Sequence, residues 1–210
     1  MVLQTIEEVM DLAPVIPVLT IENIDHAVPL ASALVRGGLR AIEIALRTEA
    51  ALNAISAIAS AVPGAVPGVG TVIGVEDLSL AKAAGARFAV SPGYAADLVA
   101  AAADLGLPYL PGIATASEAM AAQRAGLRCL KLFPAEAMGG AKTLAALAGP
   151  YPRLIFCPTG GIGRNNAGDY LALGNVRCVG GSWVAPPDLV RGEDWDAICE
   201  LASLAAGLDR

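Results

Sequence analysis

The feature that most constrains this chain is a regular alternation of short apolar runs with Ala- and Leu-rich segments at helical spacing. Eight runs have the composition of buried strands, at residues 15–20, 39–46, 65–70, 86–91, 107–112, 127–133, 153–160 and 176–182. Several of the segments between them end in the glycine expected just past a helix C-terminus. Strands that are apolar on both faces and alternate with helices predict a parallel sheet covered by helices.

Eight such units in 210 residues predict one α/β domain over residues 1–210, a compact (β/α)8 TIM barrel. A doubly wound open sheet is the alternative. The stretch 1–15 contains Glu7, Glu8 and Asp11 but no basic residue. It therefore predicts a short helix ahead of the first strand and not a signal peptide.

Composition and charge exclude several classes of function. Although 55% of the residues are hydrophobic, no apolar run approaches the ~18 residues that a membrane-spanning helix needs. The formal net charge is −6, and no basic run could follow a nucleic-acid backbone. We therefore expect a soluble, cytoplasmic protein without a nucleic-acid or membrane partner.

The residues that commonly bind metals are few and scattered. The cysteines lack the C-x-x-C spacing of metal or redox sites, so we expect reduced thiols at Cys129, Cys157, Cys178 and Cys199. His26 is the only histidine, which makes histidine-based triads and His-rich metal sites hard to build. The sequence predicts no metal and no cofactor.

Three of the units share one pattern. In each, a helix-ending glycine is followed by two residues that include an arginine and then by a strand, and these glycines are Gly38, Gly85 and Gly126. In this register Glu43 and Lys131 occupy equivalent positions on the second and sixth strands. Alternate strands fill each layer inside a TIM barrel, so a carboxylate and an ammonium from two even-numbered strands can meet across the interior.

Lys131 is the lysine whose setting needs an explanation, because it lies in the apolar run 127–133. The other two lysines, Lys82 and Lys142, fall in helical segments where their charge can reach water. Burial disfavours the charged form of an amine, and a neutral amine in a dry pocket is the nucleophile that forms Schiff bases with carbonyl compounds. Two structural alternatives remain open: Lys131 could face outward between helices, or it could only neutralise Glu43.

Two glycine clusters, CPTGGI (157–162) and VGGSW (179–183), predict turns after the last two strands. Barrel enzymes often bind phosphate in these loops because glycine lets backbone N–H groups approach the anion closely. Thr159 and Ser182 would add hydroxyl donors. The alternative is that the glycines serve only the geometry of tight turns.

Arg47 offers a second anion site. It lies four residues after Glu43, at a strand end, where a guanidinium can hold a carboxylate through two hydrogen bonds. The alternative is a helix start in which Thr48 is the N-cap and Arg47 is solvated. Thr71, at the end of the third strand, is expected to make a polar contact, and Pro92 belongs to a turn after the fourth.

Taken together, these motifs resemble the 2-keto-3-deoxy-6-phosphogluconate (KDPG) aldolases, a family that also includes activity on 4-hydroxy-2-oxoglutarate. The resemblance runs in order along almost the whole chain and rests on EIALRTEAAL, GVGTV, AVSPG, LPGIATASE, KLFPAE, CPTGGI and VGGSW. It implies a metal-independent class I aldolase of the Entner–Doudoroff pathway, on a (β/α)8 barrel that is usually a homotrimer.

The resemblance also implies roles, position by position. Lys131 corresponds to the Schiff-base lysine and Glu43 to the general acid/base. Arg47 and Thr71 correspond to the residues that hold the pyruvate carboxylate in the family. Pocket residues are implied at Pro92, Phe133 and Thr159, and phosphate-binding residues at Gly160, Gly161, Gly181 and Ser182. One departure is Thr20, since many relatives have a basic residue near the end of the first strand.

By this resemblance, KDPG is cleaved to pyruvate and glyceraldehyde 3-phosphate through an iminium ion on Lys131, while Glu43 moves protons. Cleavage of 4-hydroxy-2-oxoglutarate would give pyruvate and glyoxylate. Two alternatives use the same frame. One is a phosphosugar isomerase or epimerase with Glu43 as base and Lys131 as electrostatic support, and the other is a non-catalytic barrel that binds phosphometabolites.

Overall fold

The computed structural model describes residues 4–210, so the first three residues of the predicted N-terminal helix lie outside the described part. Each predicted run holds a strand, and the fifth holds two, separated by Pro111. The strands are β1 (Val15–Leu19), β2 (Ala41–Ala45), β3 (Val66–Gly70), β4 (Ala89–Val90), β5 (Tyr109–Leu110), β6 (Gly112–Ile113), β7 (Cys129–Leu132), β8 (Ile155–Phe156) and β9 (Val179–Gly181).

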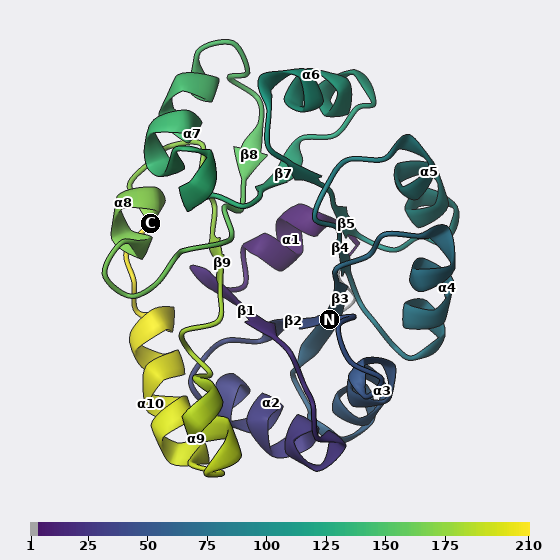
Figure 1. Cartoon of the computed structure of the whole chain (residues 1–210), viewed down its shortest axis with the longest axis vertical. Coiled ribbons are helices and arrows are strands. Elements are labelled where there is room, and N and C mark those ends of the chain that lie inside the picture. Colours follow the sequence, from purple (N-terminus) through teal and green to yellow (C-terminus); the bar gives the residue numbers. More distant parts are fainter. Residues whose placement is uncertain (1–3) are drawn as a thin grey trace.

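The helices follow the predicted alternation, and Figure 1 shows the longer ones outside the curled strands. They are α1 (Ile6–Met10), α2 (Ala27–Arg36), α3 (Ala51–Ala61), α4 (Val75–Ala83), α5 (Ala96–Asp104), α6 (Ala116–Arg124), α7 (Gly140–Ala148), α8 (Ala167–Leu171), α9 (Pro187–Arg191) and α10 (Trp195–Ala206), with 3-10 turns η1 (Ile24–His26) and η2 (Glu136–Met138). The repeat glycines adopt the left-handed backbone that favours glycine, with φ of 96°, 98° and 84° at Gly38, Gly85 and Gly126.

All paired strands are parallel, which confirms the α/β class and the helix-covered sheet. They form two sheets, with the orders β5-β4-β3-β2-β1-β9 and β6-β7-β8. The predicted barrel is thus confirmed only as a curled parallel arrangement. The sheets part between β5 and β6, at Pro111, because proline has no N–H to donate to a ladder. Successive strands lie side by side from β1 to β5 and from β6 to β8, without the reversal of order that a doubly wound sheet requires.

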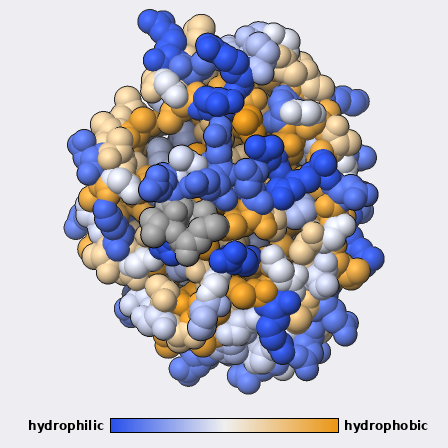
Figure 2. Space-filling view, turned by 180° about the vertical axis from the view of Figure 1, so that it is seen from behind, coloured by the Kyte–Doolittle hydropathy of each residue, from blue (hydrophilic) through white to orange (hydrophobic). Residues whose placement is uncertain are grey.

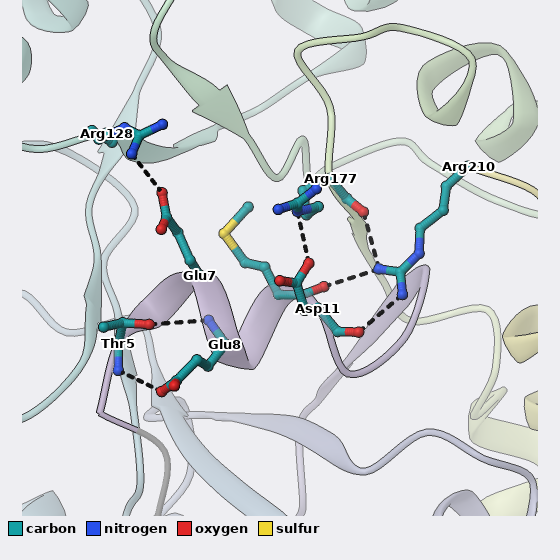
Figure 3. Close-up of polar contacts among 8 residues, drawn as sticks. Thr5, Glu7, Glu8, Asp11, Arg128, Arg177 and Arg210 are labelled. Carbon is teal, nitrogen blue, oxygen red and sulfur yellow. Dashed lines mark hydrogen bonds and ion pairs between the residues drawn. The ribbon is translucent and has the colours of Figure 1, made fainter.

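Helix α1 lies across the middle of the strands in Figure 1 and is fixed there by polar contacts drawn in Figure 3. It begins with a capping box in which Thr5 and Glu8 exchange hydrogen bonds. An ion pair joins Asp11 to Arg177 at 2.7 Å, and the guanidinium of Arg210 donates to the carbonyl of Asp11 at 2.9 Å. The contact with Arg177 holds the end of α1 against the segment before β9, and the contact with Arg210 holds it against the last residue described.

The core has two parts. The larger packs the helices onto the strands, and the smaller joins α1 to the strands. The smaller part takes residues from α1 and from around the sheet: Val9, Met10, Ile16, Ala41, Val66, Phe88, Val90, Leu110, Cys129, Cys157 and Cys178. All four cysteines are free thiols, as predicted.

One face of the molecule, seen from behind Figure 1, carries a band of hydrophilic residues across its middle, with hydrophobic residues scattered around it (Figure 2). Among residues 4–210, no helix has the length and apolar character needed to cross a bilayer.

Candidate active site

Lys131 of β7 and Glu43 of β2 meet in the interior. The Nζ atom of Lys131 lies 3.2 Å from Oε1 of Glu43, and the two side chains are only 6% and 5% exposed. The same Nζ lies 5.3 Å from the centre of the Phe133 ring. The prediction that equivalent strand positions face each other is confirmed, and the alternative of an outward-facing lysine is wrong.

Glycines leave room for this pair. Gly70, at the end of β3, lies against Glu43, and an added Cβ would overlap Oε1 and come within 2.6 Å of Cγ. Gly112 is paired with Lys131 between β6 and β7, and a Cβ there would overlap the backbone of Pro92. A larger residue at Gly70 would therefore displace the Glu43 carboxylate, and one at Gly112 would displace β6 or the Pro92 backbone beside it.

A cavity of about 540 Å³ lies next to Phe133, a volume in the usual range for small-molecule sites. Its lining includes most of the predicted site, namely Arg47, Phe133, Thr159, Gly160, Gly161, Gly181 and Ser182, and also Thr20. Lys131, Glu43, Thr71 and Pro92 do not line it. The cavity therefore runs from Phe133, which the Lys131 amine faces, toward the two late glycine clusters.

Arg47 is exposed and reaches the cavity, and no ion pair involves it within the described residues. The alternative helix start is wrong, because Ala50 is the N-cap of α3 and the Thr48 hydroxyl instead donates to the carbonyl of Ile21 at 2.6 Å. Thr71 follows β3 with φ of 63°. A threonine in this left-handed region is unusual, and such strained residues cluster at functional sites.

Pro92 is supported by a buried hydroxyl pair. The Ser91 hydroxyl donates to the carbonyl of Gly93 at 2.6 Å and accepts a hydrogen bond from Tyr109 at 2.6 Å. Burial raises the pKa of Tyr109 to about 12, so its phenol remains a donor at neutral pH. The pair fixes the turn that begins at Pro92, beside the Gly112 backbone.

The first predicted glycine turn, which we call the glycine turn (Thr159–Ile162), has backbone donors free to bind an anion. Gly160 and Gly161 have φ of 104° and 78°, so both need glycine. Over residues 4–210, the N–H groups of Gly160, Gly161 and Ile162 have no hydrogen-bond partner. Consecutive free N–H groups beside a cavity form an anion-binding concavity.

The Thr159 hydroxyl is also unpaired. Thr159 is 7% exposed, lines the cavity, and its Oγ1 has no hydrogen-bond partner among the residues described. A buried hydroxyl without a partner costs free energy unless a ligand or water satisfies it. Thr159 is therefore suited to contact a polar group of a bound molecule.

The second glycine cluster is followed by a turn, as predicted, but its two glycines lie in the strand and not in the turn. Gly180 and Gly181 belong to β9 and have no positive φ. They are needed for close approach, since a Cβ at Gly180 would overlap the Thr159 hydroxyl and one at Gly181 would overlap the ring of Trp183. The chain turns at Ser182, which is exposed and lines the cavity.

Sequence reasoning missed several polar residues that line the cavity, among them His26 and Arg191. His26 of η1 packs edge-on against Trp195, with ring centres 5.7 Å apart, and its Nε2 lies 3.4 Å from Glu193. Arg191 ends α9, a helix that no pattern in the sequence predicted. The only signal for His26 was its place in the loop after the first strand, where barrel sites are built.

Comparison with known proteins gives consistent results. The sequence model of a family described as "KDPG and KHG aldolase" matches residues 6–201. The chain is 51% identical over 199 residues to a 2-dehydro-3-deoxy-phosphogluconate aldolase of Pseudoalteromonas atlantica, covering 95% of this chain and 93% of that protein.

Solved structures show the same fold. The crystal structure of the KDPG aldolase of Zymomonas mobilis ATCC 29191 superposes with a TM-score of 0.94 at 45% identity, covering 98% of both chains. That of Legionella pneumophila, with pyruvate captured at low pH as a covalent carbinolamine intermediate, superposes with a TM-score of 0.93 at 41% identity, covering 96% of this chain and 98% of that one.

Proposed function

This chain belongs to the KDPG and KHG aldolase family, and on that premise we propose that it cleaves KDPG to pyruvate and glyceraldehyde 3-phosphate as a class I aldolase, a carbon–carbon lyase. Cleavage of 4-hydroxy-2-oxoglutarate to pyruvate and glyoxylate is a second activity that the family description supports. Family membership favours the aldolase over the isomerase, epimerase and non-catalytic alternatives. The observation that carries the proposal is the buried amine of Lys131 beside the Glu43 carboxylate.

In the proposed mechanism, the Lys131 ammonium passes a proton to Glu43, and the free amine attacks the C2 ketone of KDPG. The carbinolamine then loses water to become an iminium ion, which withdraws electrons from the C3–C4 bond. Glu43 lies 3.2 Å from the amine, so it is placed to exchange protons with the nitrogen and with the departing water. General acid/base help of this kind is typically worth ~10²–10⁴-fold.

Cleavage follows when Glu43, directly or through a water, removes the proton of the C4 hydroxyl. The C3–C4 bond breaks, its electrons pass to the iminium as an enamine, and glyceraldehyde 3-phosphate leaves. Protonation of the enamine at C3 and hydrolysis then release pyruvate and regenerate the amine. We assign the pyruvate carboxylate to Arg47 and Thr71, and the wall of the reacting centre to Pro92, Phe133 and Thr159.

We assign the phosphate of KDPG to Gly160, Gly161, Gly181 and Ser182. Support comes from the free N–H groups of the glycine turn and from the exposed Ser182, all on the same cavity as Arg47. The reacting carbons would then lie near Phe133, between the carboxylate and phosphate ends.

Three further assignments complete the proposal. We propose that the two sheets form one (β/α)8 barrel and a single domain, supported by bridges from Phe156 to Val176 and from Thr159 to Gly180. The family resemblance favours a homotrimer, and Ile73 and Val75, 76% and 42% exposed, are apolar surface that a subunit contact would cover. The four free thiols suit the reducing cytoplasm.

Steady-state cleavage of both substrates tests the function, with pyruvate measured through lactate dehydrogenase. The wild type should cleave KDPG, and Lys131→Ala should lose cleavage while keeping its circular dichroism spectrum and oligomeric state. A matched control is Lys142→Ala, which removes an exposed lysine on α7 and should keep full activity. Cleavage retained by Lys131→Ala would refute the Schiff-base role.

A further inference from the structure

The glycine turn is held from behind by a set of hydrogen bonds to its carbonyl groups. The carbonyls of Thr159 and Gly160 accept from the N–H groups of Ala135 and Glu136, at 2.8 and 3.1 Å. The carbonyl of Gly161 accepts from the amide nitrogen of Asn166 at 3.1 Å. Three consecutive carbonyls are thus bound by Ala135, Glu136 and Asn166, none of which lines the cavity, while the N–H groups of Gly160 and Gly161, which do line it, have no partner in the described part of the chain.

Two side chains fix the segments that make these bonds. The phenol of Tyr170, which is 1% exposed, donates a hydrogen bond to the carboxylate of Glu136. This bond joins α8 to η2, the segment that follows Lys131. Asn166 acts at the other end of the turn, since its side-chain oxygen accepts from Gly163 N–H at 2.8 Å while its nitrogen holds Gly161.

The space around Gly161 and Gly140 shows how closely the Glu136 and Tyr170 side chains pack against the backbone near the turn. A Cβ at Gly161 would lie 2.6 Å from Cγ of Glu136, and a Cβ at Gly140 would lie 3.0 Å from the Tyr170 hydroxyl. Both glycines have positive φ. The Glu136 stem therefore lies directly against the backbone unit whose N–H groups are free.

We propose that Glu136, Tyr170 and Asn166 are positioning residues for phosphate, which hold the N–H groups of the glycine turn toward the cavity. The inference rests on the proposed function and deepens it. None of the three side chains lines the cavity, so they act through the turn and not on the substrate. A preorganised turn binds an anion more tightly because no free energy is spent on orienting its N–H groups during binding.

The proposal predicts a dependence on substrate that general loss of stability would not produce. KDPG carries a phosphate and 4-hydroxy-2-oxoglutarate does not, while both present the same 2-keto carboxylate to Lys131 and Arg47. If the three residues only stabilise the fold, their loss should affect both substrates alike. If they orient the turn, their loss should weaken KDPG selectively.

The test compares kcat and KM for both substrates in Tyr170→Phe, Glu136→Ala and Asn166→Ala. Each should raise KM for KDPG about tenfold, the effect of about one lost hydrogen bond, and change kcat/KM for 4-hydroxy-2-oxoglutarate less than about twofold. Glu136→Gln keeps an acceptor oxygen for Tyr170 and should restore most of the affinity for KDPG. Asn166→Ser, which keeps a short polar side chain, replaces Asn166→Ala if the latter does not fold.

Matched controls remove similar bonds elsewhere. Tyr151→Phe removes a phenol that donates to the carbonyl of Ala116 at 2.7 Å, and Asn175→Ala removes an amide that donates to the carbonyl of Leu144 at 2.8 Å. Both should leave the ratio of kcat/KM for the two substrates unchanged. Equal losses on both substrates in the test variants, or an unchanged KM for KDPG, would overturn the inference. A wild type that cleaves neither substrate would overturn the proposed function itself.

Discussion

Replacing Lys131 by methionine is expected to remove activity and also to destabilise the protein, although methionine fits an apolar interior better than lysine. The reason is the partner left behind. Glu43 is 5% exposed at the side chain and has the Lys131 amine as its only ion-pair partner in the described part of the chain. Without that amine, the carboxylate must stay charged in a dry interior or take up a proton.

The magnitude follows from the geometry. At 3.2 Å and an effective dielectric constant of about 20, the Coulomb attraction is about 5 kcal/mol. Breaking a buried pair by removing one partner costs typically about 3–5 kcal/mol. We therefore expect Lys131→Met to lower the free energy of unfolding by about 3–5 kcal/mol. The double variant Lys131→Met/Glu43→Met should return to within about 2 kcal/mol of the wild type, because it leaves no unpaired charge.

The assay is urea unfolding followed by circular dichroism, at one fixed protein concentration, for the wild type, both single variants and the double variant. The expected coupling between the two positions exceeds about 2 kcal/mol, while both single variants and the double variant lack aldolase activity. Additive effects of the two substitutions, or a Lys131→Met variant as stable as the wild type, would refute the reasoning. Such a result would mean that water or another group already compensates Glu43.

Three other results are expected. Arg47→Gln should raise KM for KDPG and for 4-hydroxy-2-oxoglutarate by a similar factor, about tenfold or more, because both substrates carry the keto-acid carboxylate; an effect on only one would contradict the assignment. A hydrogen bond with Cys157 and burial raise the pKa of Cys178 well above its usual value, which makes its thiol unreactive in the native protein. Ellman's reagent should therefore modify the partly exposed Cys199 first and Cys178 only on unfolding. Partial burial raises the pKa of Glu118, but hydrogen bonds from the start of α6 outweigh it and lower that pKa below 4.5. The stabilisation is therefore fully present above pH 4.5 and is lost as the pH falls through the lowered pKa. The difference between the thermal melting temperatures of the wild type and Glu118→Gln should be largest at pH 7 and should shrink as the pH is lowered below 4.5.

Much of the fold could be predicted because it depends on local patterns that repeat. The positive φ angles at Gly38, Gly85 and Gly126 are the physical basis of the repeat, since each ends a helix and starts a strand in the same way. That shared register is why the sequence alone predicts Glu43 and Lys131 opposite each other.

The failures have equally specific causes. The break at Pro111 depends on which neighbour a single residue hydrogen-bonds, and the apolar run around it looks continuous in sequence. At Gly180 and Gly181 the sequence cannot distinguish a glycine needed for positive φ from one needed for close approach to Thr159 or Trp183. Both requirements produce the same Gly-Gly pair in the sequence.

The support behind the glycine turn could not be predicted at all. Glu136 and Tyr170 are 34 residues apart, and Tyr170 looks like an ordinary core residue of a short helix. His26 and Arg191 reach the cavity only because η1 and α9 pack beside it. Contacts of this kind are set by tertiary packing, which leaves no local periodicity or spacing in the sequence.

The central claim is that the Lys131 amine forms a covalent imine with the keto acid. The direct measurement is incubation with pyruvate and sodium borohydride, followed by mass spectrometry of the digested protein. The account predicts a mass increase of about 72 Da from a reduced pyruvate adduct, on the peptide that contains Lys131 and on no other lysine, and absent from Lys131→Ala. An unmodified Lys131 peptide, under conditions that trap another class I aldolase, would contradict it.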